Sequence, residues 1–259
     1  DDVPNFDIAT INILGTPSAA ETASASYVMR DRLDSYGVTH DWAGVLDMIK
    51  QRGTPLTDGG TAPGDSGAFA SSFMQELGQP IKMVFGYGGS AEIASAFDRG
   101  ELDTGGGSKV ETLSLYPEWA ENKVLVPIFR YGADPADDPE FVDYITNTLG
   151  EKMPPHVFDL IETTEGERAV FTLTETVNDV LSRVFALPPD TPEDIVAFWR
   201  VAFKSVVEDP DFVAAAELLG RPVQYASAED MLSALDAGRV ALEDPKLRSL
   251  FAKIAGAAD

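Results

Sequence analysis

Apolar and polar residues alternate in short blocks along the middle of the chain, and the blocks predict strands that each lead into a helix. The run at 81–85 is short and mostly apolar, as in a strand buried on both faces. Residues 86–89 include three glycines, which permit positive φ angles and a close approach of the backbone. From Ser90 the apolar residues follow helical spacing, and Gly100 stands where a helix would end. The pattern predicts a strand, a glycine turn and a helix with Ser90 as its N-cap.

A similar block stands just before this one. Residues 54–58 predict a strand, the glycine-rich segment 59–64 predicts its turn, and a helix follows with Asp65 or Ser66 as its cap. Two consecutive units of this kind imply parallel strands with right-handed crossovers, so both turns lie at one edge of a sheet. We expect the glycine cluster at 105–107 to form a third turn at that edge.

The shared edge of the predicted sheet is suited to an anion, because backbone N–H groups and helix N-termini face the crevice beyond the carboxyl ends of parallel strands. We expect Thr61, Ser66, Tyr87 and Asp103 to converge there. Each residue type also has a purely structural interpretation: glycines make turns, Ser66 caps a helix, and Asp103 ends a strand. The candidate ligand-binding residues are Gly60, Thr61, Ser66, Gly86, Tyr87, Gly88 and Asp103.

The rest of the chain is mostly helical by the same criteria. Strands are predicted at 6–15 and 124–129, the second at a sheet edge because it contains a proline. Residues 19–34 predict a strand or irregular structure that passes into a helix. Further helices are expected at 42–52, 113–122, 141–149 and 170–184, and from Thr191, Asp209, Ser227 and Asp244. Ile195, Trp199 and Phe203 share one helical face that must pack against something.

Charge narrows the possible partners. The 259 residues include 43 acidic and 19 basic side chains, for a formal net charge of -24. Such a field repels nucleic acid and anionic lipid, and it reflects either a saline habitat or a simple demand for solubility. No apolar run approaches the roughly 18 residues of a membrane span, so we expect no direct membrane insertion.

We predict that the protein does not bind nucleic acid. At physiological salt it should pass through a DNA column unretained, because its acidic side chains far outnumber its basic ones and repel the phosphates of DNA. Measurable retention would contradict this prediction.

Candidate catalytic and metal-binding chemistry is sparse. The chain has no cysteine, which excludes disulfides, thiolate zinc sites and cysteine nucleophiles in the sequence given. Its two histidines, His40 and His156, lie far apart and outside any metal-binding spacing, and neither follows a nucleophile elbow. We therefore expect no enzyme activity, no catalytic residues, no metal and no cofactor. The start Asp1-Asp2-Val3-Pro4 is typical of a trimmed mature chain and favours export.

Three motifs, which follow the family's order along the chain, resemble those of the substrate-binding proteins of tripartite tricarboxylate transporters. The first is Gly-Tyr-Gly-Gly at 86–89 with Ala-Phe-Asp-Arg-Gly-Glu-Leu-Asp at 96–103. The second is Leu-Pro-Pro-Asp-Thr-Pro at 187–192, followed by Ala-Phe at 202–203 and Glu-Asp-Pro-Asp-Phe at 208–212. The third, Pro-Gly-Asp-Ser at 63–66, resembles the small-residue loop that opens the second lobe of that family.

The resemblance implies an α/β fold of the periplasmic-binding-protein type II class, with two lobes of parallel sheets and flanking helices. Family members carry a longer N-terminal portion, so lobe one is expected to be incomplete here. On this interpretation residues 1–15 are the hinge strand of lobe one. Residues 16–182 form lobe two, and residues 183–259 return across the hinge as C-terminal helices of lobe one.

The resemblance implies a periplasmic solute-binding protein that captures a small carboxylate in an interlobe cleft and delivers it to membrane transporter subunits. The alternative is that the fold serves as a non-catalytic accessory or structural subunit of a larger extracytoplasmic complex, with a partner chain completing lobe one. In that case the helical face at 195, 199 and 203 would be exposed or covered by the partner. The sequence leaves open the identity of the ligand, the transporter or complex partner, whether binding is retained and whether residues precede Asp1.

Overall fold

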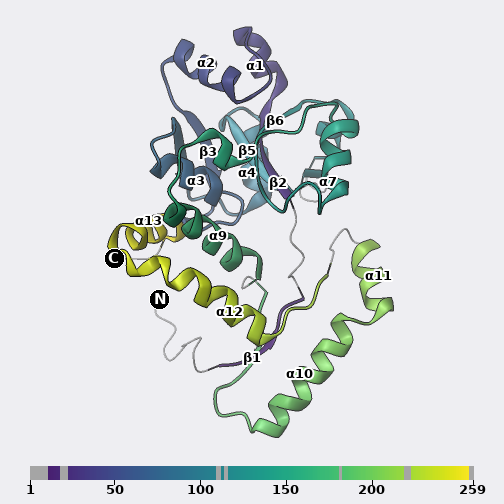
Figure 1. Cartoon of the computed structure of the whole chain (residues 1–259). Helices are drawn as coiled ribbons and strands as arrows, with labels where there is room; N and C mark the ends of the chain where they lie inside the picture. The colour runs from purple at the N-terminus through teal and green to yellow at the C-terminus, as the bar shows by residue number, and fades with distance from the viewer. Residues whose placement is uncertain are drawn as a thin grey trace. The chain divides into compact units, whose positions relative to one another are not determined.

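The chain forms two compact units, each assembled from two separate stretches. The computed structural model describes residues 11–17, 23–108, 112–113, 116–180, 183–218 and 223–256 (Figure 1). Unit 1 comprises Asp1–Ala20 and Thr176–Val240, and unit 2 comprises Glu21–Glu175 and Ala241–Asp259.

Unit 2 contains the predicted parallel strands. β3 (Leu56–Gly60) pairs in parallel with β4 (Ile81–Phe85), which confirms the two consecutive strand and helix units. β2 (Ala23–Met29) lies between β5 (Thr104–Ser108) and β6 (Leu125–Gly132) and is antiparallel to both. The start of β5 lies beside β3, because the backbone N–H that precedes β5 donates to a carbonyl of β3.

Helices surround these strands (Figure 1). In chain order they are α1 (Arg30–Tyr36), α2 (Trp42–Arg52), α3 (Phe69–Glu76), α4 (Ser90–Asp98), α6 (Pro117–Glu121), α7 (Pro139–Asp143), the π-helical turn η1 (Tyr144–Thr148), α8 (Val157–Leu160), α9 (Glu165–Val180), the 3-10 turn η2 (Ala241–Glu243) and α13 (Pro245–Ala255). α2 matches its prediction at both ends: Asp41 accepts a hydrogen bond from the Gly44 N–H at 2.9 Å, and Gly53 ends the helix at φ 74°.

Two elements of unit 2 differ from their predictions. The glycine cluster expected as a turn at 105–107 belongs to strand β5, where it pairs with β2. The helix expected at 113–122 is present only as α6, and residues 109–111 and 114–115 lie outside the described part of the chain. Pro127 lies in β6, which is an edge strand of its sheet as predicted.

Two apolar clusters form the core of unit 2. The first joins α3, β6, α8 and α9, and in it the rings of Phe73 and Phe171 meet edge to face with centroids 4.9 Å apart. The second joins β2, α4, α6, α7 and η1, and in it the rings of Phe97 and Trp119 meet edge to face at 5.4 Å. Aromatic pairs of this geometry stabilise a core beyond the area that they bury.

The last helix packs in unit 2, whereas the sequence placed it with lobe one. Ile254 of α13 is buried in the first apolar cluster, and Lys253 Nζ lies 2.7 Å from Glu76 Oε2 on α3. The apolar side chains of α13 recur at helical spacing, so any apolar surface of suitable shape could bury them. The sequence pattern reveals that stripe but not the surface that receives it.

Unit 1 is built on a small antiparallel pair, β1 (Asn12–Gly15) with β7 (Phe185–Leu187). Its helices are α10 (Glu193–Val207), α11 (Pro210–Leu218) and α12 (Ala228–Arg239), which begin close to the predicted positions. Most of the strand predicted at 6–15 lies outside the described residues.

The packed face of α10 differs from the predicted one. Phe203 packs on Phe185 with ring centroids 4.8 Å apart, and Arg200 Nε donates to the carbonyl of Ile13 at 3.0 Å. Ile195 and Trp199, which were expected to share the buried face, are 42% and 48% exposed. The contact with β1 is therefore made by the adjacent side of the helix.

Within the residues that the structure describes, no helix is both long enough and apolar enough to cross a membrane.

Candidate functional site

The two glycine turns of unit 2 lie next to each other, as predicted. They leave the carboxyl ends of the parallel strands β3 and β4, and the Gly86 N–H donates to the Thr61 carbonyl at 3.2 Å. A side chain at Gly60 would meet the ring of Phe85 at 3.0 Å and the Cβ of Ala68 at 3.1 Å. Glycine at this position therefore permits the close packing at the turn.

Asp65 organises the loop that follows β3. Its Oδ2 accepts from the N–H of Thr61 at 2.8 Å and from the Thr61 hydroxyl at 2.6 Å, and its Oδ1 accepts from the Gly67 N–H at 2.9 Å. The prediction that Asp65 or Ser66 caps the next helix is wrong, because α3 begins at Phe69 with Ala68 as its N-cap. The acceptors of Asp65 are used within the loop, and Ser66 is left exposed beside it.

The second turn leads into the N-terminus of α4. Gly89 holds the N-cap position at φ 155°, so Ser90 is the first helical residue and not the predicted cap. Glu92 Oε2 accepts from the Gly88 N–H at 2.6 Å and ties the turn to the helix. The positive end of this helix faces the region beyond the strands.

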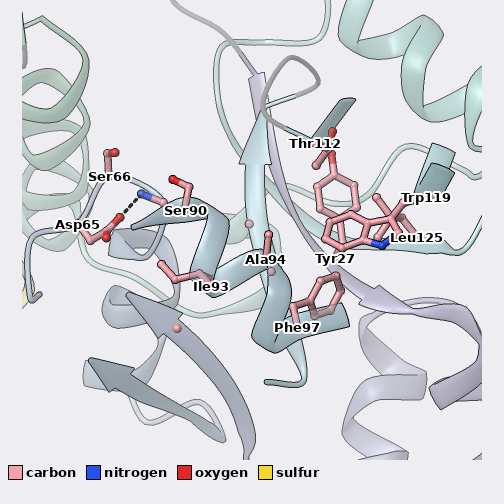
Figure 2. Close-up of a pocket in the computed structure, with 14 residues that line it drawn as sticks. Tyr27, Asp65, Ser66, Ser90, Ile93, Ala94, Phe97, Thr112, Trp119 and Leu125 are labelled. Atoms are coloured by element: carbon pink, nitrogen blue, oxygen red, sulfur yellow. Dashed lines mark hydrogen bonds between the residues drawn. The ribbon is translucent and has the colours of Figure 1, made fainter. Parts of the chain in front are cut away.

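A pocket opens beside these turns, within unit 2 (Figure 2). It is lined by Tyr27, Gly59, Asp65, Ser66, Gly67, Ser90, Ile93, Ala94, Phe97, Gly105, Gly106, Thr112, Trp119 and Leu125. The cavity volume is about 70 Å³. Since roughly 10–15 Å³ is enough for one water, the pocket has room for several waters or for a small organic molecule.

The lining residues form a polar group and an apolar group. Figure 2 shows Asp65, Ser66 and Ser90 on one side, while Tyr27 and Trp119 lie on the other. Among the described residues that line the pocket, Asp65 alone carries a carboxylate, and none is a lysine or an arginine. Any anion bound here would be held by hydroxyl and backbone N–H donors and by the α4 N-terminus.

The apolar end is closely packed. Trp119 packs between Phe97 and the stacked ring of Tyr116, whose centroid is 4.2 Å away, and its Nε1 donates to Asp98 Oδ1 at 2.9 Å. Gly105 has no room for a side chain, because an added Cβ would lie 3.1 Å from the ring of Phe97. The packed rings and the glycines, which have no side chain, together shape this end of the pocket.

Only some of the candidate residues predicted from the sequence lie at this pocket. Ser66 lines it. Gly60 ends β3, and the adjacent turns contain Thr61, Gly86, Tyr87 and Gly88. None of these five residues lines the pocket, although Gly59 does. Tyr27, Phe97 and Trp119 were missed as site residues, since aromatic residues on helices and strands are most often core. The run of three glycines in β5 was the one sequence signal that pointed to this wall.

Asp103 does not join the site. It lies beside Thr57, near the amino end of β3, where its Oδ2 accepts from the Thr57 N–H at 2.8 Å and from Arg52 Nη2 at 2.7 Å. Arg32 also forms an ion pair with it. Burial raises the pKa of Asp103, but the bonds from Arg52 and Thr57 outweigh burial and hold the pKa below its usual value. The predicted convergence of Asp103 with Thr61, Ser66 and Tyr87 is therefore wrong, because a residue that precedes β5 lies at the opposite end from the turns.

Asp58 is a buried carboxyl next to the pocket wall. It is 2% exposed in β3, and burial raises its pKa to about 6. Its Oδ1 accepts from the Gly59 N–H at 2.8 Å, while Oδ2 has no hydrogen-bond partner among the described residues. The hydroxyls of Ser71 and Thr104 lie nearby and oppose the pKa shift without meeting Oδ2 in hydrogen-bonding geometry.

In the described stretches no group of three or more histidine, aspartate or glutamate side chains is arranged to hold a metal ion.

Comparison with known proteins identifies the fold. No protein-family model matches the sequence, and no curated protein matches it. Among solved structures, R. palustris Rpa4515 with adipate matches with a TM-score of 0.57 and 17% identity, over 97% of this chain and 71% of that one. A TctC solute binding protein from Polaromonas matches with a TM-score of 0.51 and 15% identity, over 97% and 72% of the two chains.

A third match is the periplasmic binding protein BugD, with a TM-score of 0.55 and 13% identity, over 95% of this chain and 69% of that one. The chain therefore has the α/β fold of the TctC-type periplasmic binding proteins and spans about 70% of their length. This agrees with the expectation of a periplasmic-binding-protein fold whose first lobe is incomplete.

Proposed function

We propose that this protein is an extracytoplasmic solute-binding protein that captures a small carboxylate and passes it to the subunits of a tripartite tricarboxylate-type transporter. The pocket of unit 2 binds the carboxylate. The ligand is bound and released without any bond being broken. The observation that carries the proposal is the position of the pocket, beside two glycine turns and the α4 N-terminus, in a fold whose solved neighbour holds adipate.

The chemistry of the polar end supports an anionic head group. Ser66 and Ser90 each place a hydroxyl on the pocket wall, and backbone N–H groups at a helix start carry a partial positive charge. Asp65 does not compete with the ligand for these donors, because its carboxylate already accepts three hydrogen bonds from its own loop. Neutral donors of this kind can hold a carboxylate with no cationic side chain in the pocket.

The net charge of -24 gives this proposal a distinctive salt dependence. A field of that sign opposes the approach of an anion, and added salt screens it. We expect affinity for a carboxylate to rise as ionic strength rises, whereas a site built on arginine or lysine would lose affinity.

Isothermal titration with carboxylic acids of four to six carbons tests the proposal. At least one acid should bind with a Kd of about micromolar order, and putrescine, a four-carbon diamine, should not bind. Ser66→Ala and Ser90→Ala should each weaken binding by about tenfold, since each removes a donor to a charged group.

Ser205→Ala is the matched control, because Ser205 is exposed on α10 in unit 1. It should leave the affinity unchanged. Failure of every acid to bind, or an equal loss in all three serine variants, would refute the proposed site.

A further inference from the structure

The hydroxyl of Tyr27 is the unusual polar group of the pocket. Tyr27 lies on β2, is 1% exposed and lines the cavity, yet its Oη has no hydrogen-bond partner among the described residues. Buried hydroxyls are almost always paired, because an unpaired one has lost water and gained nothing in return. An unpaired hydroxyl on a residue that lines a cavity therefore points to a partner that enters the cavity.

The surroundings of this hydroxyl form a small polar corner in the apolar end. Thr112 also lines the pocket, and its Oγ1 lies 2.9 Å from the hydroxyl oxygen of Tyr144. Figure 2 shows Tyr27 between Thr112 and Trp119. Burial, with a smaller effect of Tyr144 and Tyr131, raises the pKa of Tyr27 well above its usual value. The hydroxyl therefore keeps its proton and can donate it to an oxygen atom.

The charge of the ligand at this end can also be inferred. None of the described residues that line the cavity is a lysine or an arginine, and the lining residues on the side of Tyr27 include Phe97, Trp119 and Leu125. A second carboxylate placed among them would be a buried charge without a counter-ion. Its desolvation would cost far more free energy than one hydrogen bond contributes. A neutral hydroxyl or carbonyl oxygen meets Tyr27 without that cost.

We propose that the ligand is a small acid with a neutral oxygen function at its far end, a hydroxy or oxo acid, whose distal oxygen accepts a hydrogen bond from Tyr27. This inference rests on the proposed function: the carboxylate binds at the serines and the α4 N-terminus, and the distal oxygen binds at Tyr27. Tyr27 is then the residue that selects such acids over plain fatty acids and over dicarboxylates.

The competing explanation is a resident water, for which the cavity has room. A water that pairs with Tyr27 in every complex would satisfy the hydroxyl without selecting any ligand. The two explanations give opposite results in a series of acids that differ only at the distal carbon.

Titration of two matched series provides the test. The four-carbon series is butyrate, 4-hydroxybutyrate and succinate, and the six-carbon series is hexanoate, 6-hydroxyhexanoate and adipate. In at least one series the hydroxy acid should bind about tenfold more tightly than the plain acid and the diacid. Tyr27→Phe should abolish that preference and leave the affinity for the plain acid within about twofold.

Tyr36→Phe is the matched control, since Tyr36 lies on α1 and does not line this cavity, and it should preserve the preference. The Tm of Tyr27→Phe without ligand should equal or exceed that of the wild type, which also shows that the variant folds. The inference is overturned if plain and hydroxy acids bind alike, if the diacid binds best, or if the preference survives Tyr27→Phe. If no acid of either series binds, the proposed function itself fails.

Discussion

Asp103→Asn should lower the free energy of unfolding by about 3 kcal/mol, because it leaves two partly buried arginines without their counter-ion. Asp103 accepts from Arg52 Nη1 at 2.8 Å and Nη2 at 2.7 Å, pairs with Arg32 and also accepts from Thr57. All of these partners are within unit 2 and away from the pocket. Urea unfolding followed by circular dichroism measures the change.

The surface residue Asp47 supplies the control for Asp103. Its carboxylate pairs with Lys50 one turn along α2 and is 60% exposed, so Asp47→Asn should change stability by less than about 0.5 kcal/mol. Carboxylate affinity should be unchanged in both variants. A variant at Asp103 that keeps its stability and loses the ligand would instead restore Asp103 as a binding residue, as the sequence predicted.

The pH dependence of Asp103 follows from the same contacts. Its folded-state pKa is depressed, so its contribution to stability is present above the unfolded pKa and is lost as pH falls through the folded pKa. The difference in stability between wild type and Asp103→Asn should therefore shrink in acid.

Asp58→Asn should have the opposite effect and stabilise the protein at pH 7, by up to about 3 kcal/mol. The folded pKa of Asp58 is about 6, roughly two units above that of an unfolded chain, and each unit corresponds to about 1.4 kcal/mol. Asparagine keeps an oxygen for the Gly59 N–H and carries no buried charge. The negative charge of Asp65 adds to the penalty on ionised Asp58.

The sign of the pH effect distinguishes Asp58 from most carboxylates. Because its pKa is raised on folding, the folded state binds the proton more tightly, and stability falls as pH rises from about 4 to about 6. The stability gain of Asp58→Asn should appear over that window and be small below pH 4. Thermal melts at several pH values measure it. A gain that is the same at every pH, or a loss at pH 7, would contradict the burial argument.

Individual helices and turns could be predicted from the sequence because the contacts that begin and end them are short-range. α2 begins at Asp41 and ends at Gly53 by side-chain and backbone contacts that span a few residues. The parallel pairing of β3 and β4 also followed, because a strand, a crossover helix and a second strand close in one direction only. These rules placed both glycine turns at one edge, and so located the polar end of the candidate site.

The site residues beyond those turns depended on which distant segments meet. Asp103 carried the expected chemistry but precedes the strand β5, so it pairs with arginines at the opposite end of β3. Ser90 and Asp65 were assigned as caps, yet one lines the pocket wall and the other holds a loop together. A residue type indicates what a side chain can do, and its partners decide what it does.

Periodicity along the chain determined that this protein has an α/β fold with two parallel strands and glycine turns at one edge. This was possible because the spacing of apolar residues in a strand or a helix involves only residues close in sequence. Only the tertiary structure decided that α13 packs on α3 and that Tyr27 reaches the pocket from β2. Both depend on contacts between residues far apart in the chain. The residues next to an apolar stripe or a tyrosine do not indicate which surface it will pack against, since burial against any close-packed apolar surface is favourable.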